Sequence, residues 1–341
     1  MSKVTQYLDL TTSVLSRIVK PKVSRVTIPV TYTCNQKCRT CGVWEINKKD
    51  PSKKANELTL DEFTAFCEVN KPLWIALTGG ETFLRKDMAD ITAVACRNAH
   101  FVSIVTNGSV TDKIVSDVQR ALEAPKSKAT LTISVSFNGP EEVHDSIAGV
   151  SNSYKKALET YTRLLRLRNS RLRMNISYTS SCFNAGKFIQ FSEEFPHFPG
   201  IAGVTYLVAQ DSPSYFRTDW SVVTPPEVSE TLGMIKSLLP TYKVKTIFDF
   251  IGKKYMQGYL TGKRVGCVAG RYNLMFDPYW NVYPCMFFCP TQSIGNLREL
   301  GWDLRNLDYQ KSKDLVKSCK VQCWTPCETY PTMLFRPWRA L

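Results

Sequence analysis

Six apolar, strand-like runs alternate with helical runs between about residue 26 and residue 210, and this order limits the fold more than any other feature. The strand-like runs are RVTIPVTY, LWIALTGG, FVSIVTNG, TLTISVSFNG, LRMNISYTSS and GVTYLVAQ. Strands separated by helices form parallel sheets with right-handed crossovers. We therefore expect an α/β fold, a partial (β/α)6 TIM-like barrel with its binding residues at the carboxyl ends of the strands.

The pattern changes at both ends of this region, which predicts three parts. Residues 1–23 indicate an amphipathic helix, which we expect to cap the bottom of the barrel; contact with a membrane surface is the alternative. Residues 24–225 cover the barrel. Residues 226–341 cover a helical linker, around PEVSETLGMIKSLL, and a small domain rich in cysteine. The apolar face of the first helix comprises Val4, Leu8, Leu15 and Ile18.

Charge and targeting signals limit the cellular setting. Lys and Arg number 44 against 30 Asp and Glu, so the surface is basic and suits nucleic acid, an anionic membrane or an acidic substrate. No apolar run reaches membrane-spanning length, and the N-terminus lacks the features of a signal peptide. We therefore expect a cytoplasmic protein. Twelve cysteines are many for that compartment, where disulfides are rare.

The cysteines divide into isolated residues and two groups. Cys67, Cys96 and Cys182 stand alone, and the first two lie in helix-like segments, where we expect buried apolar side chains. Two groups far apart in sequence indicate metal sites in two domains. The first group is Cys34, Cys38 and Cys41; the second is Cys267, Cys285, Cys289, Cys319, Cys323 and Cys327.

The first group lies in TYTCNQKCRTCGVWE, at C-x3-C-x2-C spacing directly after the first strand. Structural zinc usually takes four ligands, often from two C-x2-C pairs, whereas this loop supplies three thiols with no nearby histidine. Three thiolates on an iron–sulfur cubane leave one iron open for the amino and carboxylate groups of a ligand. Zinc and an inert loop are the alternatives.

With this spacing after the first strand, the sequence resembles the radical S-adenosylmethionine (radical SAM) superfamily. The resemblance implies a 4Fe-4S cluster on Cys34, Cys38 and Cys41, with S-adenosylmethionine (SAM) at the open iron. The superfamily's Gly-Gly-Glu motif is matched at the end of the second strand. There glycines allow close approach of the backbone, and Glu81 can accept from the ammonium group of SAM. Thr40 departs from the aromatic or bulky residue that the family usually has before the third cysteine.

Later strand ends continue the resemblance. The stretch SVSFNGPEEVHDSIAGV is similar to the family's S-x-D-G…H-D-x-x-R-G pattern, with Asn138 in place of Asp and Ala148 in place of Arg. His144 and Asp145 are expected to fix this loop rather than to carry out chemistry. The resemblance assigns the following residues to SAM binding: Thr78, Gly79, Gly80, Glu81, Asn107, Ser134, Ser136, Asn138 and Asn175.

The second cysteine group resembles the SPASM and twitch extensions of radical SAM enzymes, which carry auxiliary 4Fe-4S clusters. The turn D-P-x-W-N-V-Y-P-C and the following IGNL match that pattern, although Trp280 stands where the family usually has glycine. Six cysteines suffice for one fully ligated cluster with two spare thiols, or for two clusters with an open iron or another ligand. Zinc is the alternative.

The resemblance implies an enzyme that reductively cleaves SAM to a 5′-deoxyadenosyl radical, which removes a hydrogen atom from the substrate. Its electron donor would be a ferredoxin or flavodoxin. SPASM enzymes are best known for modifying peptides and proteins, so we expect such a substrate, with a lipid, sugar or other small molecule as alternatives. A non-catalytic iron–sulfur or zinc protein that binds nucleic acid is the alternative of another class. Asp211 and Asp277 are candidate acid–base groups.

Overall fold

A computed structural model describes residues 11–17, 22–199, 203–209, 250, 253–254, 257, 261, 267–321, 323 and 325–336. The predicted linker helix, Asp211 and the side chains of Val4, Leu8 and Ile18 lie outside the described residues.

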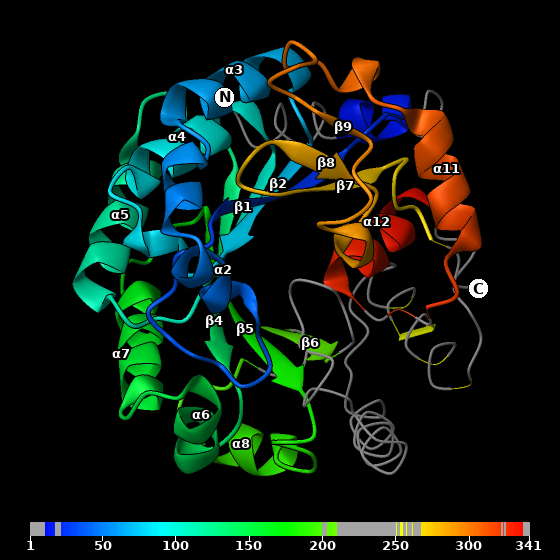
Figure 1. Ribbon diagram of the computed structural model, residues 1–341. Helices are drawn as coiled ribbons and strands as arrows, with labels where there is room; N and C mark the ends of the chain where they lie inside the picture. Colours follow the sequence, from blue (N-terminus) through cyan, green and yellow to red (C-terminus); the bar gives the residue numbers. More distant parts are fainter. Residues whose placement is uncertain are drawn as a thin grey trace.

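Six parallel strands form the barrel sheet and confirm the predicted βα units (Figure 1). Each strand pairs with the next in sequence, and the inner strands bury apolar side chains on their helix-facing side. The carboxyl ends of all six therefore meet at one end of the barrel. The strands are β1 (Arg25–Thr31), β2 (Trp74–Gly79), β3 (Phe101–Thr106), β4 (Thr130–Phe137), β5 (Leu172–Ser180) and β6 (Val204–Val208).

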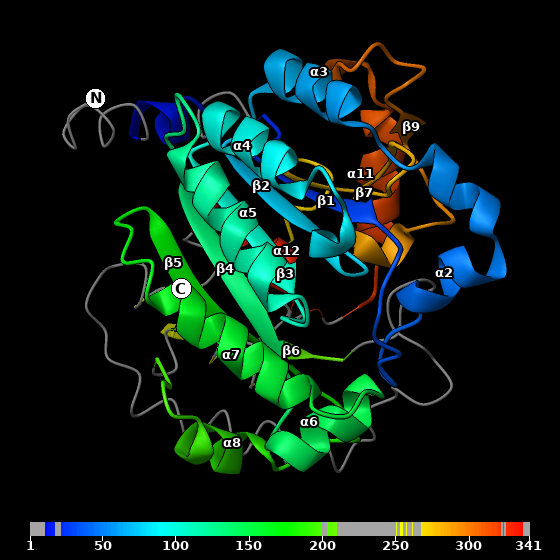
Figure 2. The ribbon, with the colours of Figure 1, turned by 90° about the vertical axis from the view of Figure 1, so that its left-hand side faces the viewer.

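Helices cover the outer face of this sheet, and Figure 2 shows α4, α5 and α7 side by side over the strands. Helix α3 begins within ELTLDEF at a capping box: Glu62 N donates to Thr59 Oγ1 (3.2 Å) and Thr59 N donates to Glu62 Oε2 (2.9 Å). The helices are α2 (Val43–Lys49), α3 (Leu60–Asn70), α4 (Met88–Asn98), α5 (Thr111–Glu123), α6 (Glu141–Ala148), α7 (Ser153–Leu165) and α8 (Phe188–Glu194). Short 3-10 turns are η1 (Pro51–Asn56), η2 (Thr82–Leu84), η5 (Met286–Phe288) and η6 (Leu304–Asn306).

The cysteine-rich region extends the barrel sheet. Its first strand, β7 (Asn273–Phe276), pairs in parallel with β1, and β8 (Asn281–Tyr283) and β9 (Gly295–Asn296) continue the sheet in antiparallel order. Helices α11 (Tyr309–Ser318) and α12 (Pro326–Phe335) follow. Phe276, Trp280 and Leu297 belong to the same apolar core as β1. The region therefore shares the barrel's core, and the domain boundary at residue 225 stays a prediction because it lies outside the described residues.

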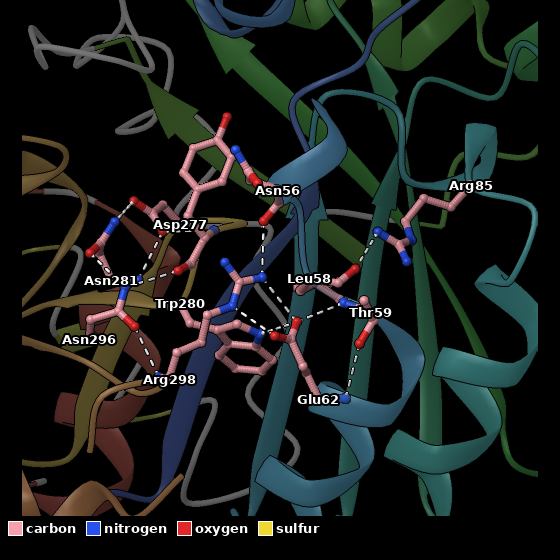
Figure 3. Close-up of polar contacts among 11 residues, drawn as sticks. Asn56, Leu58, Thr59, Glu62, Arg85, Asp277, Trp280, Asn281, Asn296 and Arg298 are labelled. Carbon is pink, nitrogen blue, oxygen red and sulfur yellow. Dashed lines mark hydrogen bonds and ion pairs between the residues drawn. The ribbon is translucent and has the colours of Figure 1, made fainter. Parts of the chain in front are cut away.

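Trp280 joins the β7–β8 turn to α3 (Figure 3). Its backbone has a left-handed φ of 66°, which explains the family's preference for glycine at this position. Its side chain is fully buried against Phe66 and Trp302, and its Nε1 donates to Glu62 Oε2 (3.2 Å). Arg298 also binds this carboxylate, through Nε (2.7 Å) and Nη2 (3.0 Å). The free energy gained by burying the indole thus offsets the cost of the left-handed backbone conformation.

Asp277 fixes the same turn (Figure 3). Its carboxylate accepts hydrogen bonds from the backbone nitrogens of Tyr279 and Asn281, from Asn281 Nδ2 and from the Tyr283 hydroxyl. These bonds saturate a buried group that does not line the barrel cavity. The prediction that Asp277 acts as an acid–base group is therefore wrong.

The described part of the N-terminal segment is helical over residues 11–17. Val14 packs against a small apolar cluster that contains Leu73 and Tyr272, whereas Leu15 is 55% exposed. Leu15 therefore does not share the packed face, contrary to the predicted stripe. None of the helices in the described part of the chain has the length and apolar character needed to cross a bilayer.

Candidate cofactor site and second cysteine group

A cavity of about 660 Å³ runs inside the barrel, lined by residues along the strands, from their amino to their carboxyl ends, and by the loop after β1. Alternation along the strands decides which side chains line it. On β4, Ser134 and Ser136 face the cavity, while Ile133 and Val135 are buried beneath the helices. The interior of this barrel is therefore polar enough to hold a hydrophilic ligand.

All three cysteines of the first group line this cavity. Burial raises the pKa of the Cys34 thiol to about 12, and the negative charges of Glu81 and Cys41 add to the shift. Burial also raises the pKa of Cys38, with contributions from both other thiols. The three thiolates thus lie close enough to repel one another, an arrangement that the positive iron–sulfur core of a bound cluster would stabilise.

The cysteine loop is held against α6. Backbone nitrogens of Lys37 and Arg39 donate to the carbonyls of Ala148 (3.1 Å) and Ile147 (2.9 Å), and Gln36 Nε2 donates to Ser153 Oγ (2.6 Å). Within the residues that the structure describes, no three His, Cys, Asp or Glu side chains converge on the position of a single metal ion. A four-iron cluster spreads its cysteine ligands over a larger volume than one ion does.

Two glycines bring the end of β2 against the start of this loop. A Cβ atom on Gly79, whose φ is 134°, would lie 2.1 Å from the Thr31 carbonyl oxygen. A Cβ atom on Gly80 would lie 2.2 Å from the Thr33 carbonyl oxygen and 3.1 Å from the Cβ of Cys34. Both glycines line the cavity, as does Thr78. Their lack of side chains is what allows β2 to approach the cysteine loop so closely.

Glu81 has a different place from the one we expected. It is fully buried and does not line the cavity, so contact between its carboxylate and an ammonium ligand stays a prediction. Its Oε1 accepts from Thr106 Oγ1 (2.8 Å) and Phe83 N (3.1 Å), and its Oε2 accepts from Asn107 N (2.7 Å). Burial raises the pKa of Glu81, while these hydrogen bonds oppose the shift. Glu81 therefore positions the end of β3, and with it Asn107, on the cavity wall.

The other predicted SAM residues come together. Asn175 Nδ2 donates to Ser134 Oγ (3.3 Å), which links β5 to β4 inside the cavity. Eight of the nine predicted residues line this one cavity, Glu81 being the exception. These eight are Thr78, Gly79, Gly80, Asn107, Ser134, Ser136, Asn138 and Asn175.

Comparison with known proteins agrees with this geometry. Residues 28–177 match the family model described as the radical SAM superfamily. The chain thus contains a radical SAM domain over these residues. It is 24% identical over 285 residues to the antilisterial bacteriocin subtilosin biosynthesis protein AlbA of Bacillus subtilis (strain 168). That match covers 81% of this chain and 58% of AlbA, so the chain spans little more than half of this relative's length.

Solved structures show the same fold. The AdoMet-bound structure of anSMEcpe is 17% identical, with a TM-score of 0.59, and the match covers 88% of this chain and 84% of that one. Streptococcus suis SuiB is 12% identical, with a TM-score of 0.58, over 90% of this chain and 73% of SuiB. The predicted α/β barrel of the radical SAM type is thus confirmed.

The loop after β4 in this radical SAM barrel is held by His144 and Asp145, as expected. Asn138 N donates to His144 Nδ1 (3.2 Å), and His144 Nε2 pairs with Ser153 Oγ (3.0 Å). Asp145 accepts from the backbone nitrogens of Asn152 (2.7 Å) and Tyr154 (2.8 Å). Both side chains are fully used in fixing the loop that carries Asn138.

Acid is expected to weaken the fold through His144. Burial lowers the pKa of His144 from 6.5 to about 4, so between these values the unfolded chain binds a proton that the folded chain does not. The free energy of unfolding of the metal-free protein should therefore fall as pH drops from 6.5, by about 2 kcal/mol at pH 5. Urea denaturation at pH 7 and pH 5 measures this loss. His144→Gln should reduce it, whereas His197→Gln, at an exposed histidine, should not; equal losses in both variants would contradict the assignment.

Three thiols of the second group, those of Cys267, Cys285 and Cys323, lie within reach of the charge of the buried Glu328 carboxyl group. Cys267 Sγ lies 3.9 Å from Glu328 Oε2, and Asn273 Nδ2 donates to Glu328 Oε1 (2.7 Å). Burial raises the pKa of Cys285, and the charges of Glu328, Cys267 and Cys323 add to the shift. The charge of Cys319 acts on Cys267, and the charge of Cys327 acts on Cys323.

Glu328 was not identified from the sequence, where only its place directly after the last cysteine marks it. Burial raises its pKa to about 8, against the opposing positive charge of Arg25. Burial therefore disfavours the ionised forms of both Glu328 and the neighbouring thiols. A positively charged iron–sulfur core bound here would stabilise the thiolates.

Cys289 and Cys327 have different surroundings from the thiols near Glu328. Cys289 is fully buried in an apolar cluster with Tyr32 and Tyr283, and its Sγ lies 4.0 Å from the Tyr32 hydroxyl. Cys327 lines the main cavity, with its Sγ 3.9 Å from Thr27 Oγ1. Their role as cluster ligands stays a prediction. Cys67 and Cys96 are completely buried apolar residues, as expected.

Proposed function

We propose that this chain binds a 4Fe-4S cluster through Cys34, Cys38 and Cys41, cleaves SAM reductively in the barrel cavity, and modifies a peptide or protein. One observation carries the proposal: the three thiols and the eight cavity-facing residues predicted for SAM line a single cavity. A binding module for nucleic acid has no need of such a pocket.

The residues of the chain have separate tasks in this proposal. The bound cluster and SAM supply, on one-electron reduction, a 5′-deoxyadenosyl radical that removes a hydrogen atom from the substrate. Gly79 and Gly80 let the polar backbone of β2 reach the ligand, while Glu81 holds Asn107 in place. Ser134 and Asn175 present a hydroxyl and an amide as hydrogen-bonding groups for the polar parts of SAM.

The names of related proteins favour a peptide substrate. AlbA is a bacteriocin biosynthesis protein, and SuiB and anSMEcpe have been solved with peptides, the precursor peptide SuiA in the first case and Kp18Cys in the second. The 660 Å³ cavity must hold SAM as well as the reacting part of the substrate. It therefore suits one side chain of a longer peptide that lies mainly outside.

The second cysteine group is proposed to hold one auxiliary 4Fe-4S cluster. Cys267, Cys285, Cys319 and Cys323 would be its ligands, because the charge of Glu328 acts on three of these thiols and the charge of Cys319 acts on Cys267. Cys289 and Cys327 are then the two spare thiols. A cytoplasmic ferredoxin or flavodoxin would supply the electron.

Anaerobic reconstitution tests the proposal. The holoprotein should be brown, carry about eight irons per chain, and form 5′-deoxyadenosine from SAM and dithionite. Peptides encoded beside the gene, and separately lipid and sugar extracts, should then be incubated with it, and a mass change in a peptide is the expected result. A colourless zinc protein without SAM cleavage would overturn the catalytic proposal, and modification of a lipid or sugar alone would overturn the peptide substrate.

A further inference from the structure

A second hollow, of about 840 Å³, lies at the other end of the sheet. Its walls come from residues 22–23 before β1, residues 69–70 at the end of α3, residues 267 and 269–271 before β7, residues 303–305 at η6, and one side of α11. Because β1 and β7 are parallel, the segments before them lie together at the amino ends of the strands. The first cysteine loop follows β1 and lies at the opposite, carboxyl ends. Figure 1 shows α11 alongside the β7–β9 end of the sheet.

This hollow is strongly basic. Lys22, Arg271, Arg305 and Lys313 line it, against one acidic residue, Asp303, which gives a net charge of 4 − 1 = +3. Arg305 pairs with Asp303 (2.6 Å). In the described part of the chain no carboxylate lies within ion-pair distance of the other three cations. Burial lowers the pKa of Lys22, and the positive charges of Arg17, Arg305 and Lys71 lower it further against the opposing charge of Asp303.

Apolar side chains lie exposed within the basic rim. Val69 is 51% exposed and Tyr309 is 37% exposed, and both line the hollow. A small anion gains nothing from apolar surface, whereas protein interfaces combine an apolar centre with a polar rim. The hollow therefore fits a protein with acidic residues around an apolar patch better than it fits a free phosphate.

The wall of the hollow also includes a thiol of the second cysteine group. Cys267 is exposed and lines the hollow, and its Sγ lies 3.9 Å from Glu328 Oε2. The charges of Cys319 and Cys323 act on this thiol. Reductive cleavage of SAM, as proposed above, needs one electron from outside the chain. Electron transfer slows steeply with distance, so a donor in this hollow would have a short path to the second cysteine group.

We propose that this hollow docks an acidic one-electron carrier protein of the flavodoxin or ferredoxin class. Lys22, Arg271 and Lys313 meet its carboxylates, and Val69 and Tyr309 meet its apolar centre. The inference rests on the proposed function, because it gives the external electron an entry point. In the transfer step the carrier is oxidised by one electron, the cluster of the second cysteine group is reduced by one electron, and no bond forms or breaks.

Charge reversal tests the docking. We expect reduced flavodoxin to bind the holoprotein at low ionic strength and to bind more weakly as salt is added. Lys22→Glu with Lys313→Glu should raise the Kd for flavodoxin by about tenfold or more. Lys22→Gln with Lys313→Gln removes the two charges without reversing them and should give a Kd between those of the wild type and the glutamate pair. Lys128→Glu with Arg166→Glu makes the same change in charge at two exposed positions elsewhere and should leave the Kd unchanged.

A small reductant separates this inference from the proposed function. With dithionite, all variants should form 5′-deoxyadenosine at equal rates, whereas with flavodoxin the charge-reversed pair should be slow. Absence of SAM cleavage with dithionite in every protein would overturn the proposed function, while the Kd values would still decide the docking. The inference is overturned by unchanged flavodoxin affinity in the Lys22 and Lys313 pair, by an equal loss in the control pair, or by failure of the wild-type protein to bind either flavodoxin or a ferredoxin tested in parallel.

Discussion

Replacing Cys38 by serine is expected to reduce SAM cleavage to background and to remove about half of the bound iron. The three thiols of the first group line one cavity, and the charges of Cys34 and Cys41 already act on Cys38. An open iron is left for SAM only if all three thiolates bind the cluster. A serine hydroxyl does not ionise near neutral pH and is a poor ligand for iron, so the loop would retain two ligands.

Iron analysis, electron paramagnetic resonance of the reduced protein and 5′-deoxyadenosine formation measure this effect. Cys285→Ser should remove the other half of the iron and leave the signal of the SAM-binding cluster. Cys182→Ser is the matched control, because Cys182 belongs to neither group, and it should change neither quantity. A Cys38→Ser protein that keeps its full iron content and its SAM cleavage would show that the first loop does not hold the cluster.

The barrel and most of the cavity follow from local sequence pattern. Each strand is an apolar run bounded by glycine or polar residues, and the carboxyl ends of parallel strands must meet. Cys34 and Ser134 therefore reach the same cavity although one hundred positions separate them, 134 − 34 = 100. Alternation along β4 then decides that Ser134 faces inward and Val135 faces the helices.

Side-chain direction beyond the strand ends does not follow from such patterns. Glu81 comes directly after β2, where the chain turns, and it points toward the β3 end instead of into the cavity. Its direction depends on donors supplied by Thr106 and Asn107, which belong to the next strand. The sequence marks a carboxylate at a strand end but not the partner that orients it.

The position of the cysteine-rich region could not be predicted from the sequence, because it depends on pairing between distant segments. Strand β7 has four residues and joins β1 across most of the chain, so no local period reveals that it extends the barrel sheet. The strained backbone at Trp280 is likewise tolerated only because α3 supplies Phe66 and Glu62 around the indole. The role of Glu328 depends on the same assembly, since its neighbours Cys267 and Asn273 lie far from it in sequence.

Replacing Gly80 by alanine is the substitution that we expect to be most damaging outside the cysteines. The added Cβ would lie 2.2 Å from the Thr33 carbonyl oxygen, and a backbone atom cannot swing aside as the end of a flexible side chain can. The segment that leads to Cys34 must therefore shift, at a cost of about 1–3 kcal/mol in stability. Since Cys34 is the first ligand of the proposed cluster, the shift should also lower iron loading and SAM affinity several-fold.

Gly301→Ala is a suitable control for this substitution. Gly301 has a φ of 64°, so alanine there costs about 1 kcal/mol of backbone strain, but no atom lies within 4 Å of the added Cβ. Both variants should lower the melting temperature of the metal-free protein, whereas only Gly80→Ala should lose iron and SAM binding. Gly80→Ala with unchanged iron content and SAM affinity would contradict the close fit between β2 and the cysteine loop. Loss of iron in both variants would mean that general destabilisation, and not displacement of the loop, controls cluster binding.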